Sequence, residues 1–402
     1  MKISIFLISL LIIIIVPNTF YMYYENSTST GVGLVFSIAI IFFLFLFKDK
    51  VIYLDKSLIP ILFSLIFVFL TSIYSMILFD VFEYKRFFFS YFLICICVLA
   101  AFCFVIISSK ITDRQLFNYV SIIFYLILFD GIYLFISNTF FIQSSKSTLL
   151  FPEMSHFSII FAPLLLFKVL TFKNTIHVYL SILISLTLAL SLLNLTLLIS
   201  TFLIMMIYSI KKTFLFFLIP LVIVALFFDI GDFQYFIDRI PTSDTQNLSA
   251  LVFLSGWERA FLSLIDSSFF GIGFNQLGFV GKTGFFQSEI ISLGSPKLNI
   301  TDGGSLAPKI ISELGIVGLA FILIYLFHLV KAVYMVKKKK LIYNYLDTFY
   351  ISIFIMSFVS IFIRSSGYFS PIVFLLLSSI IYINKFKLTD HNIFLNRKIP
   401  KL

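Results

Sequence analysis

Residues 87–108 read FFFSYFLICICVLAAFCFVIIS, an apolar run without a charged side chain. A helix needs about 20 mostly apolar residues to cross a bilayer, so this run is long enough to span one. It contains Cys95, Cys97 and Cys103, the 3 cysteines of the chain, which we interpret as small buried apolar side chains. No histidine or second cysteine pair lies near them at ligand spacing, so they predict neither a disulfide framework nor a zinc site.

Apolar runs of this kind dominate the 402-residue chain, which is 60% hydrophobic and only 12% charged. Soluble domains are usually about 45–50% apolar and about 25% charged, and disordered chains have the opposite composition to this one. The sequence therefore excludes a soluble enzyme, a soluble DNA-binding domain and an intrinsically disordered protein. It predicts an all-α polytopic integral membrane protein.

The apolar runs predict about twelve transmembrane helices. The expected spans are 3–22, 31–47, 58–79, 87–108, 117–137, 154–171, 176–191, 193–210, 213–229, 309–330, 346–364 and 368–384. The stretch 176–210 is too long for one helix and short for two, so we divide it near 191–194 and keep eleven spans as the alternative. The first run also resembles a signal peptide, but no small-residue cleavage site follows it, which favours a retained span.

Lysine and arginine cluster at alternate ends of these spans. Positive charge in short loops marks the cytoplasmic side of a membrane protein, so we interpret the net charge of +10 as a topology signal and expect both termini in the cytoplasm. The chain then divides into four parts: about nine N-terminal spans over 1–228, one large outer loop over 229–308, about three C-terminal spans over 309–384 and a basic cytoplasmic tail over 385–402.

The outer loop 229–308 is the only long polar segment of the sequence. Its glycines allow tight turns or close approach of the backbone to a ligand. The Gly-x-Gly at 271–273 lacks the third glycine and the strand-to-helix context of a dinucleotide-binding fingerprint. Arg259 would place a planar, permanently charged fork beside that turn, and such a fork suits diphosphate oxygens. The apolar stretch 248–270 favours a folded, partly membrane-apposed element over a solvated spacer.

Ionisable residues at membrane depth are costly, so each is a functional hypothesis. Glu153 and His156 are three residues apart at the outer end of the sixth span, where the carboxylate could orient the imidazole as a general base or a sugar clamp. A contact of Glu153 with the helix N-terminus is the alternative. Arg364 is either a functional cation or a snorkelling interfacial arginine. Lys309 is either an anion contact or the partner of Glu313 in an i,i+4 ion pair.

Several short motifs resemble those of one known family. The stretch FPEMSHF at 151–157 resembles the Glu-Pro-Ser-His motif at the start of a mid-chain span in bacterial polysaccharide polymerases, with Met154 where proline is usual. WERA at 257–260, FGIG at 270–273 and ELGIVGL at 313–319 follow in the order of the periplasmic-loop pattern of the O-antigen polymerase and ligase superfamily.

This resemblance implies a GT-C-like polytopic glycosyltransferase of the bacterial inner membrane. Such an O-antigen or oligosaccharide repeat-unit polymerase transfers the growing glycan from undecaprenyl pyrophosphate to the non-reducing end of an incoming lipid-linked repeat unit. By position, Arg259 would contact the pyrophosphate, and Glu153 or His156 would assist the acceptor hydroxyl. The expected substrate-binding residues are Arg364, Lys309, Trp257, Gly271, Gly273, Asn275 and Arg86.

The resemblance also sets the expected partners. They are the lipid-linked oligosaccharide, membrane lipid and a polysaccharide chain-length regulator, with no nucleic acid, no cofactor and no metal. Ligases of the superfamily carry a histidine shortly before the re-entering span, and 301–307 has none, which favours a polymerase. A flippase, which would usually show two similar halves, and a structural membrane protein are the competing functions. Sugar specificity, linkage and the identity of the catalytic base stay open.

Overall fold

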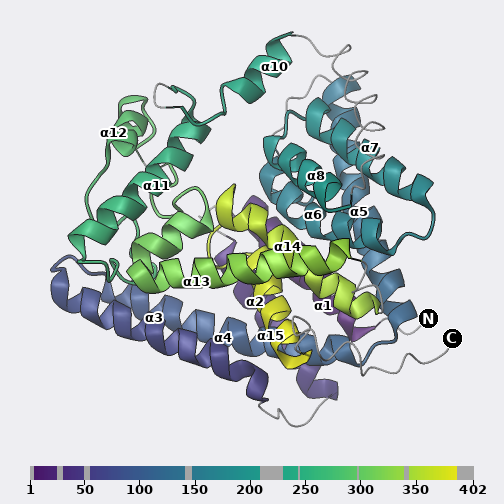
Figure 1. Cartoon of the computed structure of the whole chain (residues 1–402), viewed down its shortest axis with the longest axis horizontal. Coiled ribbons are helices and arrows are strands. Elements are labelled where there is room, and N and C mark those ends of the chain that lie inside the picture. Colours follow the sequence, from purple (N-terminus) through teal and green to yellow (C-terminus); the bar gives the residue numbers. More distant parts are fainter. Residues whose placement is uncertain are drawn as a thin grey trace.

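The computed structural model describes residues 4–24, 30–48, 55–140, 147–208, 230–242, 245–296, 298–338 and 344–386. Within these ranges every regular element is a helix (Figure 1). Eight of the helices there are long and apolar enough to cross a membrane. By helix length and hydropathy, the chain is therefore a multi-pass membrane protein.

The N-terminal helices follow the predicted spans closely. They are α1 (Ile5–Tyr23), α2 (Gly31–Lys48), the short 3-10 helix η1 (Lys56–Leu58), α3 (Ile59–Leu78), α4 (Tyr84–Ser109), α5 (Asp113–Phe140), α6 (Met154–Thr171), α7 (Thr175–Ser191) and α8 (Leu195–Tyr208). The division of 176–210 is confirmed, because the chain turns at Leu193, which has a φ of 48°, and α8 starts after Asn194. The expected span 213–229 lies outside the described residues.

The rest of the described chain contains six helices. They are α10 (Ile230–Ile237), α11 (Leu248–Asp266), α12 (Phe285–Ser292), α13 (Leu306–Lys337), α14 (Tyr345–Phe362) and α15 (Pro371–Phe386). The predicted outer loop is thus largely structured, and α11 within it is itself one of the eight candidate spans. α13 starts before the expected residue 309, because Pro308 falls in the first turn, where backbone N–H groups have no acceptor within the helix.

The centre of the molecule is the pair of helices α6 and α14. In the membrane-spanning segments of these helices, 83% and 78% of the residues are buried. The two helices run antiparallel. Glu153, just before α6, contacts Arg364, just after α14, and at the opposite ends the rings of Phe167 and Phe349 lie 6.2 Å apart. Antiparallel packing therefore brings together two charged residues that are 211 positions apart in the sequence.

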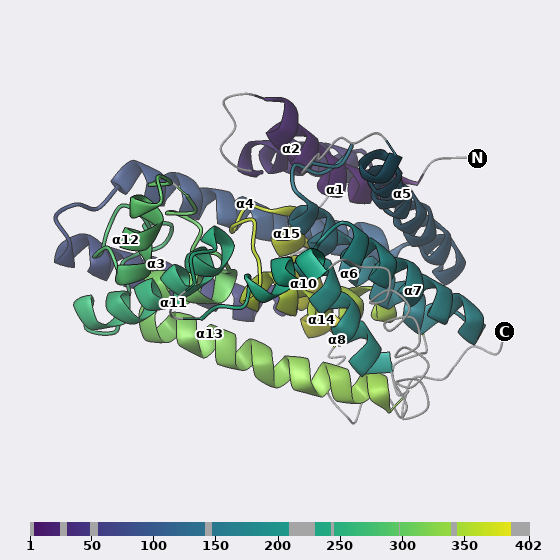
Figure 2. The same ribbon diagram turned by 90° about the horizontal axis from the view of Figure 1, so that it is seen from above.

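α13 is interrupted at Gly315, where φ is 59° and ψ is −133°. The loop that follows α11 supplies the hydrogen bonds lost at this break, which lets irregular backbone exist at membrane depth. Its bonds run from Ile272 N to Ser312 O at 3.0 Å, from Gly273 N to Glu313 O at 2.9 Å and from Ile316 N to Phe269 O at 2.8 Å. As a result, α11 and the first part of α13 lie side by side (Figure 2).

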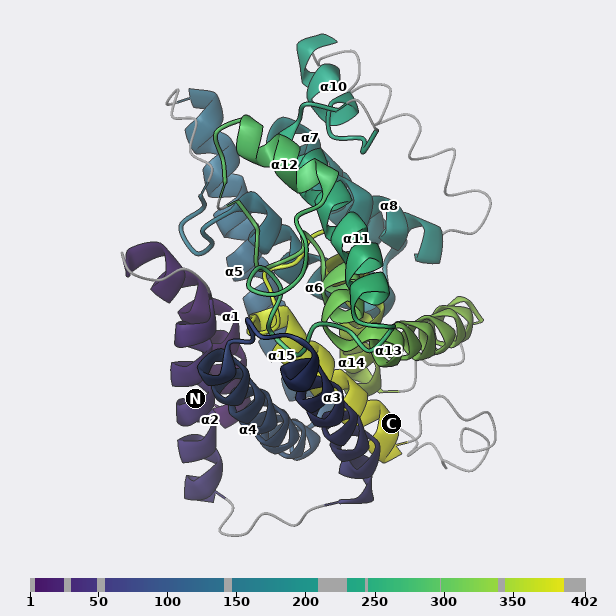
Figure 3. The ribbon, with the colours of Figure 1, turned by 90° about the vertical axis from the view of Figure 1, so that its left-hand side faces the viewer.

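We call residues 248–314 the outer unit, which comprises α11, α12, their loops and the start of α13. Figure 3 shows α11 and α12 stacked beyond the ends of α3 and α4. Serine hydroxyls of α3 connect the two parts: Phe274 N donates to Ser72 Oγ at 3.0 Å, and Ser75 Oγ donates to Gly271 O at 2.9 Å. The outer unit is thus anchored to the membrane helices by its backbone.

Candidate functional site

A partly exposed ion pair joins Glu153, just before α6, and Arg364, just after α14. Arg364 Nη2 donates to Glu153 Oε2 at 3.1 Å, and the side chains of Arg364 and Glu153 are 25% and 44% exposed. Burial alone would raise the pKa of Glu153, but the charges of Arg364 and His156 outweigh it and hold that pKa below its usual value. Glu153 is therefore ionised at neutral pH, and both side chains of the pair are within reach of a ligand.

The expected contact, in which the Glu153 carboxylate orients the His156 imidazole, does not form. Glu153 is the N-cap of α6 and has extended backbone, with φ −141° and ψ 150°, so it does not share the helical face of His156. Its carboxylate accepts from Arg364 and from Ser155 and makes no capping hydrogen bond, although Glu153 does lie at the N-terminus of α6, where the alternative of a contact with the helix dipole places it. His156 is 8% exposed, its Nδ1 has no hydrogen-bond partner, and its ring lies 6.3 Å from that of Tyr21.

Arg259 and Lys309 hold the backbone of the outer unit. Arg259 Nη1 donates to Ile300 O at 2.6 Å, and Lys309 Nζ donates to Thr301 O at 2.6 Å. The side chains are only 6% and 3% exposed. The two cations expected at the pyrophosphate are therefore buried and already bound to consecutive peptide carbonyls.

The expected ion pair between Lys309 and Glu313 is also absent. Lys309 Nζ instead lies 3.8 Å from Asp302 Oδ1 and 4.8 Å from the centre of the Tyr368 ring. Burial, followed by the charge of Glu313, raises the pKa of Tyr368 well above its usual value. Since Tyr368 follows Arg364 by four residues, Lys309 and Asp302 lie beside the segment that carries the accessible ion pair.

The second group of expected residues holds the outer unit together and attaches it to the membrane helices. The fully buried Glu313 carboxylate accepts from Asn275 N at 2.8 Å and from Leu277 N at 3.1 Å. Arg86 Nε donates to Asn275 O at 2.7 Å. A Cβ added to Gly273 would lie 2.5 Å from the Phe82 ring. Arg86, Gly273 and Asn275 therefore contact the protein's own chain at positions where a ligand contact was expected.

The WERA motif on α11 organises the outer unit. Glu258 accepts from Phe285 N at 2.6 Å and from Phe286 N at 2.9 Å, which satisfies the first donors of α12, and Arg259 holds the loop at Ile300. Trp257 is half-buried and packs against Phe253 at 6.5 Å. No polar contact links Trp257 to the charged residues in the described part of the chain.

The start of α6 is braced by two residues that sequence reasoning missed. Asn194 Nδ2 donates to Met154 O at 2.9 Å and to Ser158 Oγ at 2.7 Å. The buried Asp130 accepts from Leu149 N at 2.9 Å. A lone carboxylate inside the predicted span 117–137 was a usable signal for Asp130, whereas nothing local marked Asn194.

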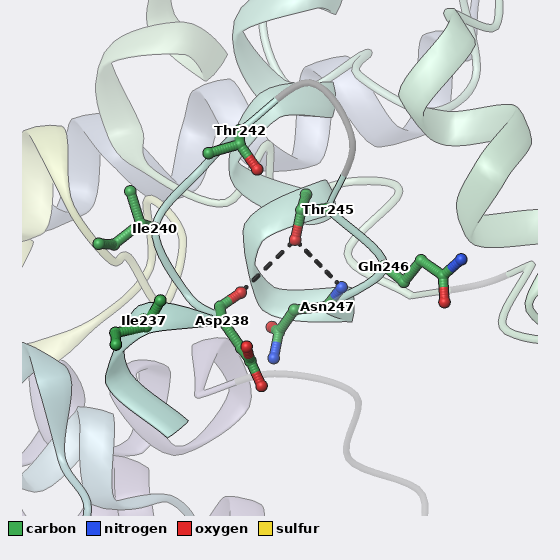
Figure 4. A pocket seen from close by; sticks show the side chains of 7 residues that line it. All are labelled: Ile237, Asp238, Ile240, Thr242, Thr245, Gln246 and Asn247. Atoms are coloured by element: carbon green, nitrogen blue, oxygen red, sulfur yellow. Dashed lines mark hydrogen bonds between the residues drawn. The ribbon is translucent and has the colours of Figure 1, made fainter. Parts of the chain in front are cut away.

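Figure 4 shows a pocket between the end of α10 and the start of α11. Among the described residues of its walls, Asp238 is the one with an ionisable side chain. The hydroxyl of Thr245 is used inside this segment, because it accepts from Asn247 N and donates to Asp238 O. None of the expected site residues lines the pocket; the lining residues are Ile237, Asp238, Ile240, Thr242, Thr245, Gln246 and Asn247. We therefore place the candidate site at the Glu153–Arg364 pair.

The chemistry available at this pair is anion binding next to hydroxyl recognition. Arg364 offers an accessible guanidinium, Glu153 and Asp302 are half-exposed carboxylates, and His156 adds a buried imidazole. Among the described residues, no group of three or more His, Cys, Asp and Glu side chains is placed to hold a metal ion. Comparison of the chain with protein-family models, curated proteins and solved structures gives no match.

Proposed function

We propose that this protein is an O-antigen or oligosaccharide repeat-unit polymerase. It would be a membrane glycosyltransferase of the bacterial inner membrane, with about twelve spans, both termini in the cytoplasm and the outer unit at the periplasmic face. It transfers the growing glycan from undecaprenyl pyrophosphate to the non-reducing end of an incoming lipid-linked repeat unit. A chain-length regulator and membrane lipid are its proposed partners.

The observation that carries this proposal is the accessible Glu153–Arg364 pair at the outer ends of the two most buried helices. A planar guanidinium binds diphosphate oxygens in a bidentate manner. A cation fixed where charge develops on the leaving group lowers the reaction barrier. The neighbouring lipid-facing helices can accommodate the long isoprenoid chain of such a donor.

The geometry changes the proposed roles of the cations. Arg364 contacts the pyrophosphate, because it is the more exposed cation of the group, and Glu153 orients its guanidinium. Arg259 and Lys309 act indirectly, since their buried guanidinium and ammonium groups hold the loop at Ile300 and Thr301. Two of the expected direct contacts thus become supports for the site.

A flippase is the main alternative, because transporters use interrupted helices at their substrate sites. The interruption of α13 at Gly315 differs from such a site. The backbone groups that lose their helical partners at the break are hydrogen-bonded to residues 269–273 of the same chain. They are therefore not available to coordinate an ion or a substrate. This self-closed break favours the polymerase.

The proposal is tested in a strain that lacks the gene, by a surface-polysaccharide gel and by extraction of lipid-linked glycans. A polymerase defect leaves lipid A core with a single repeat and no ladder. Bare core with accumulated lipid-linked polymer would identify a ligase, and bare core with accumulated single lipid-linked repeats would identify a flippase. An unchanged ladder would refute a role in this pathway.

A matched pair of variants then tests the site. Arg364→Gln should abolish the ladder in the complemented strain at normal protein level. Lys282→Gln removes a cation that is 74% exposed on the outer unit, and it should restore the ladder fully. Equal activity of the two variants would refute the role of Arg364.

A further inference from the structure

The loop 300–304 is held in place from several sides. Arg259 and Lys309 bind its carbonyls at Ile300 and Thr301, and Ser365 N donates to Gly304 O at 3.1 Å. This last bond ties the loop to the segment that joins α14 to α15, which lies beside it in Figure 3. Two buried cations and one backbone bond thus fix a segment of five residues.

The residue in the middle of this loop is Asp302, which sequence reasoning did not select. A Cβ added to Gly367 would lie 3.3 Å from Asp302 Oδ1, so the carboxylate packs directly on the segment that follows Arg364. Asp302 is also within electrostatic reach of His156. The loop therefore places Asp302 against the segment that follows Arg364.

The carboxylate of Asp302 can still accept a hydrogen bond from a ligand, whereas the other carboxylates of this region already accept hydrogen bonds from the protein. Glu258 and Glu313 each accept two backbone N–H groups, and Glu153 accepts from Arg364. Asp302 is 43% exposed, its closest cation is Lys309 Nζ at 3.8 Å, and no hydrogen bond reaches its carboxylate within the described ranges. A carboxylate held this firmly and left without a donor is suited to a ligand hydroxyl.

We propose that Asp302 is the catalytic base that accepts the proton of the attacking sugar hydroxyl. This inference rests on the proposed glycosyl transfer. The acceptor oxygen forms a bond to the anomeric carbon of the donor, and its proton passes to the Asp302 carboxylate. The bond between that carbon and the pyrophosphate oxygen breaks, and the electron pair leaves with undecaprenyl pyrophosphate.

The surroundings of the other two candidate bases favour Asp302. The Glu153 carboxylate accepts hydrogen bonds from Arg364 and Ser155, so it is already engaged with the cation assigned to the leaving group. His156 is only 8% exposed, whereas Asp302 is open to a ligand.

The test uses purified full-length protein in liposomes, supplied with lipid-linked repeat units extracted from the strain that lacks the gene. Asp302→Asn keeps the shape of the side chain and should lower the rate of polymer formation by about 10²–10⁴-fold, the usual contribution of a general base. Glu289→Gln removes an exposed carboxylate from α12 and should keep the wild-type rate. Thermal unfolding of both variants should match the wild type.

Rescue by an external base separates proton transfer from positioning. Asp302→Ala should be inactive and should regain activity in proportion to added formate, and Arg364→Gln should not respond. A wild-type rate for Asp302→Asn would overturn the role of Asp302 and leave the proposed function intact. Inactivity of Asp302→Ala without formate rescue would also overturn it, in favour of a binding role. Absence of polymer from the wild-type protein would refute the proposed function and the base together.

Discussion

Substituting Gly271 tests whether the loop after α11 lies in close backbone contact with the break in α13. Gly271 has a φ of 86°, and an added Cβ would lie 2.5 Å from Glu313 O and 2.5 Å from Gly315 N. A left-handed conformation costs an L-residue about 1–2 kcal/mol, and overpacking adds about 1–3 kcal/mol. Gly271→Ala should therefore lower the free energy of unfolding by about 2–5 kcal/mol.

Gly294 provides the matched control. Its φ is 79°, and nothing lies within 4 Å of an added Cβ, so Gly294→Ala should cost only the conformational part, about 1–2 kcal/mol. Unfolding can be followed by the fluorescence of Trp257, the single tryptophan of the chain, during denaturation in mixed micelles. Equal destabilisation by the two substitutions would show that no close backbone contact exists at Gly271.

Three further predictions concern charged residues. Glu313→Gln presents an amide donor to one of two backbone N–H groups, so it should cost about 1–3 kcal/mol in the same denaturation assay; unchanged stability would contradict the bonding. Arg259→Lys should destabilise the outer unit and Arg364→Lys should not, because only Arg259 is buried against a carbonyl; loss of transfer by a fully stable Arg259→Lys protein would restore a direct role for Arg259. Folding lowers the pKa of Glu153, so its stabilisation is present at neutral pH and is lost as the pH falls through the folded-state pKa. The free energy of unfolding lost on acidification should be below about 1 kcal/mol for so exposed a pair, and Glu153→Gln should not show this loss. If the wild type and Glu153→Gln lost equal stability in acid, the pair would be excluded as the source.

The helices could be predicted from sequence because the requirement for about 20 apolar residues is local. The turn between α7 and α8 was found in this way, and so was the central helix α6. The break in α13 could not be found, since the glycine motif at 271–273 and Gly315 are separated by α12 and its flanking loops, and only the folded structure brings them together. The apolar stretch 248–270 inside the long loop predicted a folded, partly membrane-apposed element, and α11 (Leu248–Asp266) lies there.

The candidate site was predicted in part. Glu153 and Arg364 were each selected as costly charges at membrane depth, but their pairing depends on the antiparallel packing of α6 and α14. Asp302 was missed because an acidic residue in a polar loop is common, and only the folded loop brings it against the segment that follows Arg364. The contact of Arg259 could not be predicted because its partner is a backbone carbonyl 41 residues away, and a carbonyl leaves no mark in a sequence.

The difference between the buried cations, which bind loop carbonyls, and the exposed Arg364 follows from the energetics of loops near a membrane. Backbone carbonyls outside helices must find donors when water is excluded, and arginine and lysine are long enough to reach them from a neighbouring helix. A buried cation on a loop motif is therefore first a candidate donor to the loop itself, as Arg259 and Lys309 are. A ligand contact requires exposure in addition, and Arg364 and Asp302 retain it. On this reasoning the motif residues build the site, while residues outside the motifs carry its chemistry.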